Sequence, residues 1–325
     1  MKWSLAAFAI VLVLTIACNS SKPSSSTAPT PPAPITPAPT PITITGRGVS
    51  TNGALPLAGV EVSLGPAKVV TDNAGRFVLA LSPISLAPLT LSASTIVTRV
   101  ATISADRERD ISVDAFSLDT FDLGFYRALA RNGYEAPSSL QPIRRWTEPP
   151  MLYLRTIDEA NQPIDSVTLD ATAATLQNMA GFWSGGHFGF AGIERGTGTR
   201  ETVPGWITVK WPNPPLGPGI CGDAALGSNP GVIRLNYLGQ CSCGSLKIYP
   251  TLVRHELGHA FGYYHTDNAK DVMYGGSSLP CDGQPSAREG EYARYMYSRV
   301  VGNVDPDTDP PTSVTVNSMA RIVVR

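Results

Sequence analysis

Three of the four histidines in this chain of 325 residues lie between positions 255 and 265, in the stretch RHELGHAFGYYH. His255 and His259 are four positions apart, so on a helix their imidazoles project from one face, about one turn apart. Two ligands of a single tetrahedral metal ion need this arrangement. Gly262 can end the helix in a left-handed conformation and turn the chain back. We therefore predict a metal site whose third ligand is His265.

Glu256 follows the first of these histidines directly. A carboxylate at this position can take a proton from water on the open position of the metal, which is the role of the general base in zinc hydrolysis. Three protein ligands and an open position indicate a catalytic site, because structural zinc sites are closed by a fourth protein ligand. The pattern predicts one catalytic Zn²⁺, which polarises a carbonyl group and lowers the pKa of its bound water.

The full spacing His-Glu-x-x-His-x-x-Gly-x-x-His resembles the zinc motif of the metzincin metalloproteases, in which a Met-turn follows under the metal. The stretch DVMYG at 271–275 is similar to that turn, and the resemblance places Met273 beneath the zinc. It covers about residues 151–299 and implies a zinc metallopeptidase that acts on protein or peptide substrates. Tyr274 follows the methionine as in matrixins, the nearest subfamily, although Thr266 stands where matrixins typically have serine.

Two other functions compete with a zinc endopeptidase. The chain could be a catalytically silent peptide-binding or adhesin-like surface lipoprotein on a metzincin scaffold, or a structural lipoprotein that docks to envelope material. The intact Glu256 argues against the silent binder, since a carboxylate without a catalytic role has little reason to complete the motif. Substrate preference and the choice between endopeptidase and aminopeptidase action stay open at this level.

The sequence around the histidines predicts the elements that must position them. A helix opens near Pro250, because the missing N–H of proline would have no partner in a first helical turn. Ser286 and Glu289 form a capping box for a last helix that runs to about Arg299. Apolar periodicity predicts helices in FDLGFYRALARNGY and 167–183, and strands at 151–157, in FGFAGIERG, at 206–211 and at 231–237.

This mixed pattern predicts a second domain over residues 114–300, and the resemblance makes it an α/β zincin of the metzincin type. By the same analogy, an extended substrate would add to the edge strand of its sheet. The candidates for that edge are GVIRLNY, which precedes the helix region, and WITVKW. Residues 301–325 form a C-terminal tail that the pattern does not assign.

Residues 42–113 show short alternating runs separated by turn residues, which predict a small antiparallel β-sandwich. The segment Pro56–Leu81 resembles the carboxypeptidase regulatory-like (transthyretin-like) module. It lacks histidine and cysteine, so a spacer or docking unit is expected. We interpret Asp72, Asn73 and Gly75 as a turn, with a calcium loop as the alternative; calcium is left undecided.

Residues 1–17 are interpreted as an export signal, because their apolar run is too short to cross a hydrocarbon core of about 30 Å. The following Cys18 resembles the acylated cysteine of a bacterial lipobox, with simple secretion or an uncleaved anchor as alternatives. Asn19 favours the outer membrane in a Gram-negative host. Residues 18–41 are a Ser/Thr/Pro-rich linker. We expect an exported protein of the bacterial cell envelope, either lipid-anchored or secreted.

Four cysteines follow Cys18, and an even number in an exported protein predicts two disulfides, with a second zinc site as the alternative. Cys241 and Cys243 are poorly placed to bridge each other. Each is therefore expected to pair with Cys221 or Cys281, and either connectivity holds the segment of the zinc helix.

Three aromatic residues have two interpretations each. His187 lies in a glycine-rich loop and is read as structural or surface, with a second metal or substrate contact as the alternative. Tyr263 and Tyr264 either line the cleft or pack against the end of the helix.

Composition limits the partners. The chain has 25 basic and 26 acidic residues, and no run of Lys or Arg is dense enough to neutralise a phosphate backbone, so nucleic acid is not expected. Its 29 prolines and 30 glycines are typical of turns, linkers and short strands. The oligomeric state is not predicted.

Overall fold

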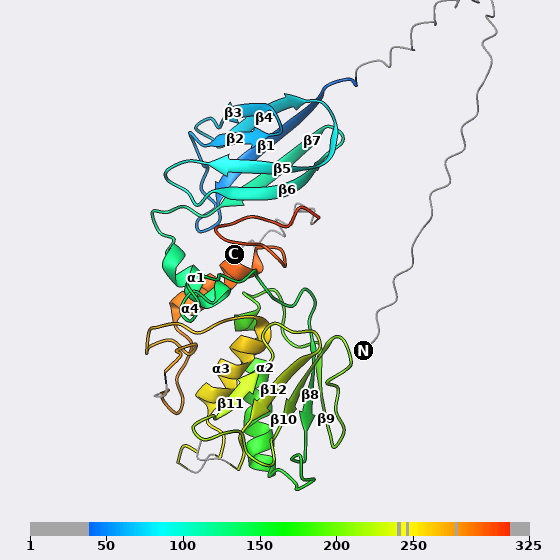
Figure 1. The fold of residues 1–325 in the computed structure, drawn as a ribbon, viewed down its shortest axis with the longest axis vertical. Coiled ribbons are helices and arrows are strands. Elements are labelled where there is room, and N and C mark those ends of the chain that lie inside the picture. The colour runs from blue at the N-terminus through cyan, green and yellow to red at the C-terminus, as the bar shows by residue number, and fades with distance from the viewer. Residues whose placement is uncertain (1–38, 239–241, 245–246, 277–278, 313–325) are drawn as a thin grey trace, which may run out of the picture. The chain divides into compact units, whose positions relative to one another are not determined.

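The computed structural model describes residues 39–312, apart from 239–241, 245–246 and 277–278. Within these ranges the protein is β-rich, with strands in three separate sheets and few helices (Figure 1). The expected signal sequence, Cys18 and nearly all of the linker lie outside the described residues. So does the end of the chain after residue 312.

Two sheets form residues 42–115, which we call the β-module. A three-stranded sheet has the order β4-β1-β7 and a four-stranded sheet the order β3-β2-β5-β6. Their bounds are β1 Ile42–Ser50, β2 Glu61–Leu64, β3 Ala67–Val70, β4 Arg76–Leu81, β5 Ile84–Ser92, β6 Arg99–Ala105 and β7 Arg109–Ala115.

One strand pair of the β-module departs from the predicted antiparallel arrangement. All its neighbouring strands are antiparallel except β1 and β7, which run parallel with Ile44 opposite Arg109. The chain leaves the first sheet after β4, forms β5 and β6 in the other sheet, and returns as β7. Because β7 forms no hairpin with β1, alternation of side chains could not predict its direction.

The β-module has its own apolar core. Ile44 of β1, Val62 of β2 and Leu89 of β5 are fully buried in one cluster that both sheets share. The predicted turn before β4 is confirmed: the Asp72 carboxylate accepts hydrogen bonds from two backbone N–H groups, and Gly75 has a φ of 74°. Asp72 is thus engaged as a turn residue.

The described residues after the β-module include a five-stranded sheet of order β11-β12-β10-β8-β9, in which only β11 is antiparallel to its neighbour. Its strands are β8 Met151–Arg155, β9 Gly192–Gly196, β10 Trp206–Lys210, β11 Gly222–Ala224 and β12 Gly231–Leu235. The helices are α1 Leu123–Arg131, α2 Ser166–Trp183, α3 Pro250–Phe261 and α4 Ala287–Tyr297. The predicted capping box of α4 is present.

The sheet and the helices bury a second apolar core. Leu176 of α2, Ile207 of β10 and Leu257 of α3 belong to one cluster and are fully buried. Trp183, the last residue of α2, donates from its indole N–H to the Arg254 carbonyl at 3.0 Å. This contact holds α2 against α3, the helix that carries the histidines.

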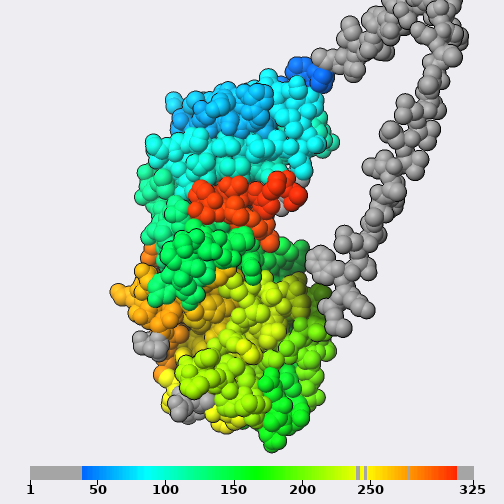
Figure 2. Space-filling model, viewed as in Figure 1, coloured from blue at the N-terminus to red at the C-terminus, as the bar shows by residue number. Residues whose placement is uncertain are grey.

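A buried charged cluster links the β-module to the segment after α4. Arg99 of β6 forms a bidentate pair with Asp309, and Arg299 contacts both Asp307 and Asp114 of β7. In Figure 2 the segment 300–312, in red, borders the β-module, in agreement with these contacts. Part of the unassigned C-terminal tail is thus held between charged partners. We call Arg99, Asp114, Arg299, Asp307 and Asp309 the charged cluster.

Candidate metal centre

Helix α3 carries the first two histidines and ends as the sequence predicts. Pro250 is its first residue, and Gly262 caps it in the left-handed region at φ 108°. A side chain at Gly262 would place its Cβ 1.8 Å from the Arg144 carbonyl oxygen. Glycine is therefore required twice here, for its conformation and for the close approach, and the chain turns back towards His265.

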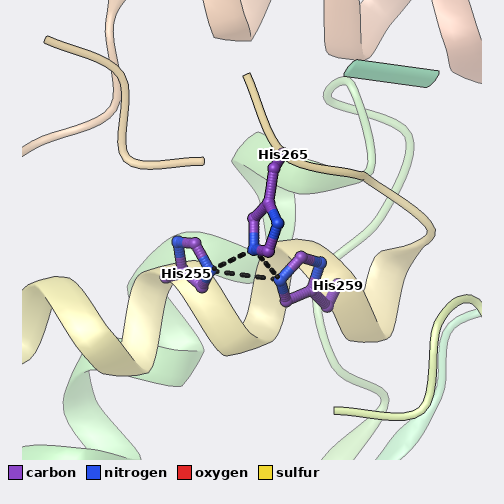
Figure 3. A group of neighbouring side chains, drawn as sticks. All are labelled: His255, His259 and His265. Carbon is purple, nitrogen blue, oxygen red and sulfur yellow. Dashed lines mark hydrogen bonds between the residues drawn. The ribbon is translucent and has the colours of Figure 1, made fainter. Parts of the chain in front are cut away.

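The three histidines point at one another (Figure 3). The Nε2 atoms of His255 and His259 are 3.1 Å apart, and His265 Nε2 lies 3.2 and 3.0 Å from them. The Nδ1 atoms face carbonyl oxygens in two cases, Val272 for His255 and Tyr263 for His259, both at 2.7 Å. A carbonyl only accepts, so each of these two rings carries its proton on Nδ1 and turns a lone pair on Nε2 towards the centre.

This arrangement fits a tetrahedral metal ion. Two Zn–N bonds of about 2.0–2.1 Å at a tetrahedral angle separate the nitrogens by about 3.3 Å, near the observed spacing. Burial lowers the pKa of His255 to about 4, and burial, with the neighbouring histidines, lowers the pKa of His259 well below its ordinary value. Both rings are therefore neutral at pH 7, the form that binds metal.

Glu256 lies beside the cluster with an unsatisfied oxygen. Its side chain is 3% exposed, and its Oε2 has no hydrogen-bond partner among the described residues. Burial, and then the charge of Asp223, raise the pKa of this carboxyl well above its ordinary value. Glu256 lines a cavity of about 310 Å³ together with the three histidines. A buried carboxylate aimed into a cavity needs a proton or a cation there.

Met273 packs under α3 at the point between the two helical histidines. It is fully buried, and a side chain at Gly258 would place its Cβ 2.3 Å from the Met273 sulfur. Glu289 of α4 accepts hydrogen bonds from the backbone N–H groups of Met273 and Val272 at 2.9 and 3.2 Å. The capping-box glutamate therefore also holds this turn, a role that sequence reasoning missed.

The edge of the sheet beside the cavity is not a predicted strand. Both candidates, WITVKW and GVIRLNY, are interior strands β10 and β12, and the edge is β11. Both expectations were wrong because β11 has only three residues, Gly222–Ala224, and shows no apolar alternation. Gly222 lies against the general-base candidate, since a Cβ there would be 2.8 Å from Glu256 Oε1.

One of the expected disulfides is present between Cys243 and Cys281, which are 38 positions apart on either side of α3. Cys221 is also disulfide-bonded. Cys241 lies outside the described residues. The Cys243–Cys281 bridge therefore closes the loop that contains the helix of the metal centre.

The three ambiguous aromatic residues separate in the structure. Tyr264 lines the cavity, whereas Tyr263 is fully buried and donates its hydroxyl hydrogen bond to the Trp183 carbonyl at 2.7 Å. His187 is not part of the histidine cluster, and its ring packs against Tyr297. Its structural interpretation is the one that these contacts favour.

Sequence reasoning also missed Glu135, which lines the cavity from the loop after α1. Its Oε1 lies 2.5 Å from Nδ1 of His265. The two residues are 130 positions apart, and no local pattern marks Glu135 in the sequence.

Comparisons with known proteins add a distant likeness. No protein-family model and no curated protein matches the chain. The crystal structure of metalloproteinase-II from Bacteroides fragilis matches 80% of this chain and 92% of its own, at 12% identity and a TM-score of 0.31. A cohesin–X-dockerin complex from Acetivibrio cellulolyticus matches 23% of this chain at 18% identity and a TM-score of 0.21.

The chain spans 58% of that cohesin–X-dockerin match. A 9R-lipoxygenase from Cyanothece matches 48% of this chain and 25% of its own, at 16% identity and a TM-score of 0.21. These TM-scores are too low for any of the three to say what this chain does. The class that fold and site define is a β-rich protein with a three-histidine cluster able to hold a metal ion.

Proposed function

We propose that the protein is a zinc-dependent endopeptidase of the metzincin type. One observation carries the proposal: three Nε2 atoms converge beside Glu256, whose buried Oε2 has no partner among the described residues. Three imidazoles, with no fourth protein ligand beside them among the described residues, are the donor set of a catalytic zinc site. His255, His259 and His265 would hold the ion.

Zinc bound there supplies a Lewis acid that polarises a carbonyl group and lowers the pKa of water. Glu256 then acts as the general base. Its carboxylate takes one proton from the attacking water while the water oxygen bonds to the carbonyl carbon of the peptide. The same carboxyl group gives that proton to the leaving nitrogen as the C–N bond breaks, so the base is regenerated. Its burial excludes bulk water from this transfer.

The edge of the five-stranded sheet at β11, which pairs with no further strand among the described residues, offers a place for the substrate. β11 ends the sheet order, and Gly222, Asp223 and Ala224 all line the cavity. An extended peptide that pairs with this edge would pass the histidine cluster and expose its main chain to Glu256. A protein or peptide segment in extended form is therefore the proposed substrate.

We also propose that the protein is exported and lipid-anchored at Cys18 in the bacterial envelope. The sequence supports this through the short apolar run before Cys18 and the Pro-rich linker after it. None of the helices in the described ranges combines the length and the apolar composition that a membrane crossing requires. Cell fractionation of the Cys18→Ala variant tests this anchor. If the variant moves from the membrane fraction to the soluble fraction, the result supports the anchor. An unchanged membrane fraction would refute it.

Cleavage of casein by the zinc-loaded mature chain tests the enzyme, with Glu256→Ala as the matched variant. We expect the variant to lose activity by about 10²–10⁴-fold while bound zinc stays near one per chain. If the Glu256→Ala variant cleaved casein as fast as the wild type, Glu256 would not be the general base. A wild type that binds zinc and peptide without cutting would favour the silent peptide-binding alternative.

A further inference from the structure

The third ligand is positioned differently from the other two. His255 and His259 stand on one helix, and their Nδ1 atoms face backbone carbonyl oxygens. His265 stands beyond the end of that helix, and its Nδ1 faces a side chain, the Glu135 carboxylate, at 2.5 Å. The orientation of this one ring therefore depends on a residue from another part of the chain.

The loop that carries Glu135 is fixed next to the third ligand by several contacts. Helix α1 is capped by Asn132, which follows its last residue, has a left-handed φ of 60° and turns the chain. The Tyr264 N–H donates to the Leu129 carbonyl of α1 at 2.8 Å. Tyr134 packs on the other side, where a side chain at Gly275 would approach its ring to 2.9 Å. Glu135 thus faces His265 from a braced loop.

We propose that Glu135 is the positioning residue of the third metal ligand. Its carboxylate accepts the Nδ1–H bond, which fixes the tautomer that leaves Nε2 free and makes that nitrogen a stronger donor. This inference rests on the metal centre of the proposed function. It goes further by assigning a residue outside the His-Glu-x-x-His-x-x-Gly-x-x-His pattern.

Exposure separates this role from a structural one. The side chains of Glu135 and His265 are 50% and 26% exposed, so their hydrogen bond contributes little to folding. Partners of metal-bound histidines, in contrast, typically change metal affinity by 10–100-fold. Removing the Glu135 carboxylate should therefore change zinc affinity and leave the stability of the metal-free chain unchanged.

The test measures zinc dissociation constants of the full mature chain by competition with a chelating indicator at pH 7. We expect Glu135→Ala to weaken zinc binding about 10–100-fold. Glu135→Gln keeps an oxygen acceptor and loses the charge, so its loss should be smaller. Glu148→Gln is the matched control, because Glu148 is an exposed glutamate that does not line the cavity. Cobalt substitution should show altered visible absorption in Glu135→Ala only.

Three outcomes would overturn the inference. Glu135→Ala could bind zinc within twofold of the wild type, Glu148→Gln could weaken binding as much as Glu135→Gln, or Glu135→Ala could destabilise the metal-free chain in proportion to its lost affinity. A wild type that binds no zinc would overturn the inference together with the proposed function. A wild type that binds zinc, responds to Glu135→Ala and does not cut peptides would overturn the proposed function alone.

Discussion

The charged cluster and the histidine cluster are both groups of fully or partly buried polar side chains, yet their hydrogen-bonding and charge requirements are met in different ways. In the charged cluster each guanidinium lies against carboxylates, as Arg299 lies against Asp114 and Asp307. Burial alone would raise the pKa of Asp114, but the charges of Arg299 and Arg99 hold it below its ordinary value. In the histidine cluster, three Nε2 atoms face one another with no donor between them.

This difference separates a structural cluster from a ligand site. Opposite charges that compensate one another leave no charge for a ligand to neutralise. Removing one of these side chains leaves its former partners as uncompensated buried charges. Converging lone pairs beside the buried Oε2 of Glu256 are unfavourable until a cation arrives. The charged cluster should therefore control stability without metal, and the histidine cluster should control metal affinity with little effect on the metal-free fold.

Replacing Arg299 by methionine should give the largest effect. Its side chain is fully buried, and its loss leaves the Asp114 and Asp307 carboxylates without their main partner. Breaking a buried ion pair on one side typically lowers the free energy of unfolding by about 3–5 kcal/mol. Urea unfolding of the metal-free chain measures the loss, and the zinc dissociation constant of the folded variant should stay unchanged.

The matched control is Arg195→Met, which removes an exposed ion pair with Asp170 and should change stability by less than about 1 kcal/mol. A loss of zinc affinity in Arg299→Met would contradict the separation of the two clusters. Equal free energies of unfolding for Arg299→Met and Arg195→Met would show that the charged cluster does not stabilise the fold.

The opposite variant, His259→Gln, should remove metal binding and spare the fold. It deletes one ligand and the hydrogen bond to the Tyr263 carbonyl, so the metal-free chain should lose about 1 kcal/mol. At a zinc concentration 1,000 times the wild-type dissociation constant, bound zinc stabilises the wild type by about 4 kcal/mol, and the variant should lack this gain. Thermal unfolding with and without zinc measures both terms.

His187→Gln is the control for this experiment, since it makes the same substitution outside the cluster and should keep the zinc-dependent gain. If His259→Gln still gained as much stability from zinc as the wild type, the ion would bind elsewhere and the comparison between the clusters would fail.

The features that could be predicted from the sequence are those encoded by a local pattern of residues. Spacing alone brought His255, His259 and His265 into one hypothesis, and the Gly262 exit and the α4 capping box are present in the structure. Period-two alternation found most strands, because each shows its buried face within a few residues. Cys281, which pairs with Cys243 in the structure, is one of the two partners expected for that cysteine.

What the sequence could not predict depends on partners far along the chain. Glu135 lies 130 positions from His265, and Arg99 lies 210 positions from Asp309. Neither pair produces a periodic pattern or a short fixed spacing that could be detected in the sequence. The strand β11 was not predicted for another reason. With only three residues, it is shorter than the window in which alternation of apolar and polar residues can be recognised.

The smallest predicted effect, about 1 kcal/mol between pH 6.5 and 5.5, is the contribution of one histidine to the pH dependence of the metal-free histidine cluster, best measured in Glu256→Gln. Burial lowers the pKa of folded His255 to about 4, against about 6.5 in the unfolded chain. As pH falls below 6.5, the unfolded chain takes up protons that the folded chain refuses, so stability is lost between about pH 6.5 and 4. The loss should approach about 1.4 kcal/mol per pH unit for each buried histidine.

The Glu256→Gln background is needed because that carboxyl titrates with the opposite sign. Burial raises its pKa in the folded state, so the folded chain takes up its proton first, and stability rises as pH falls towards the unfolded value. Replacing His255 by glutamine in the same background should reduce the slope between pH 6.5 and 5.5 by the share of one histidine. A slope that did not change would mean that His255 is hydrated in the folded chain, and the contrast with the charged cluster would then rest on His259 alone.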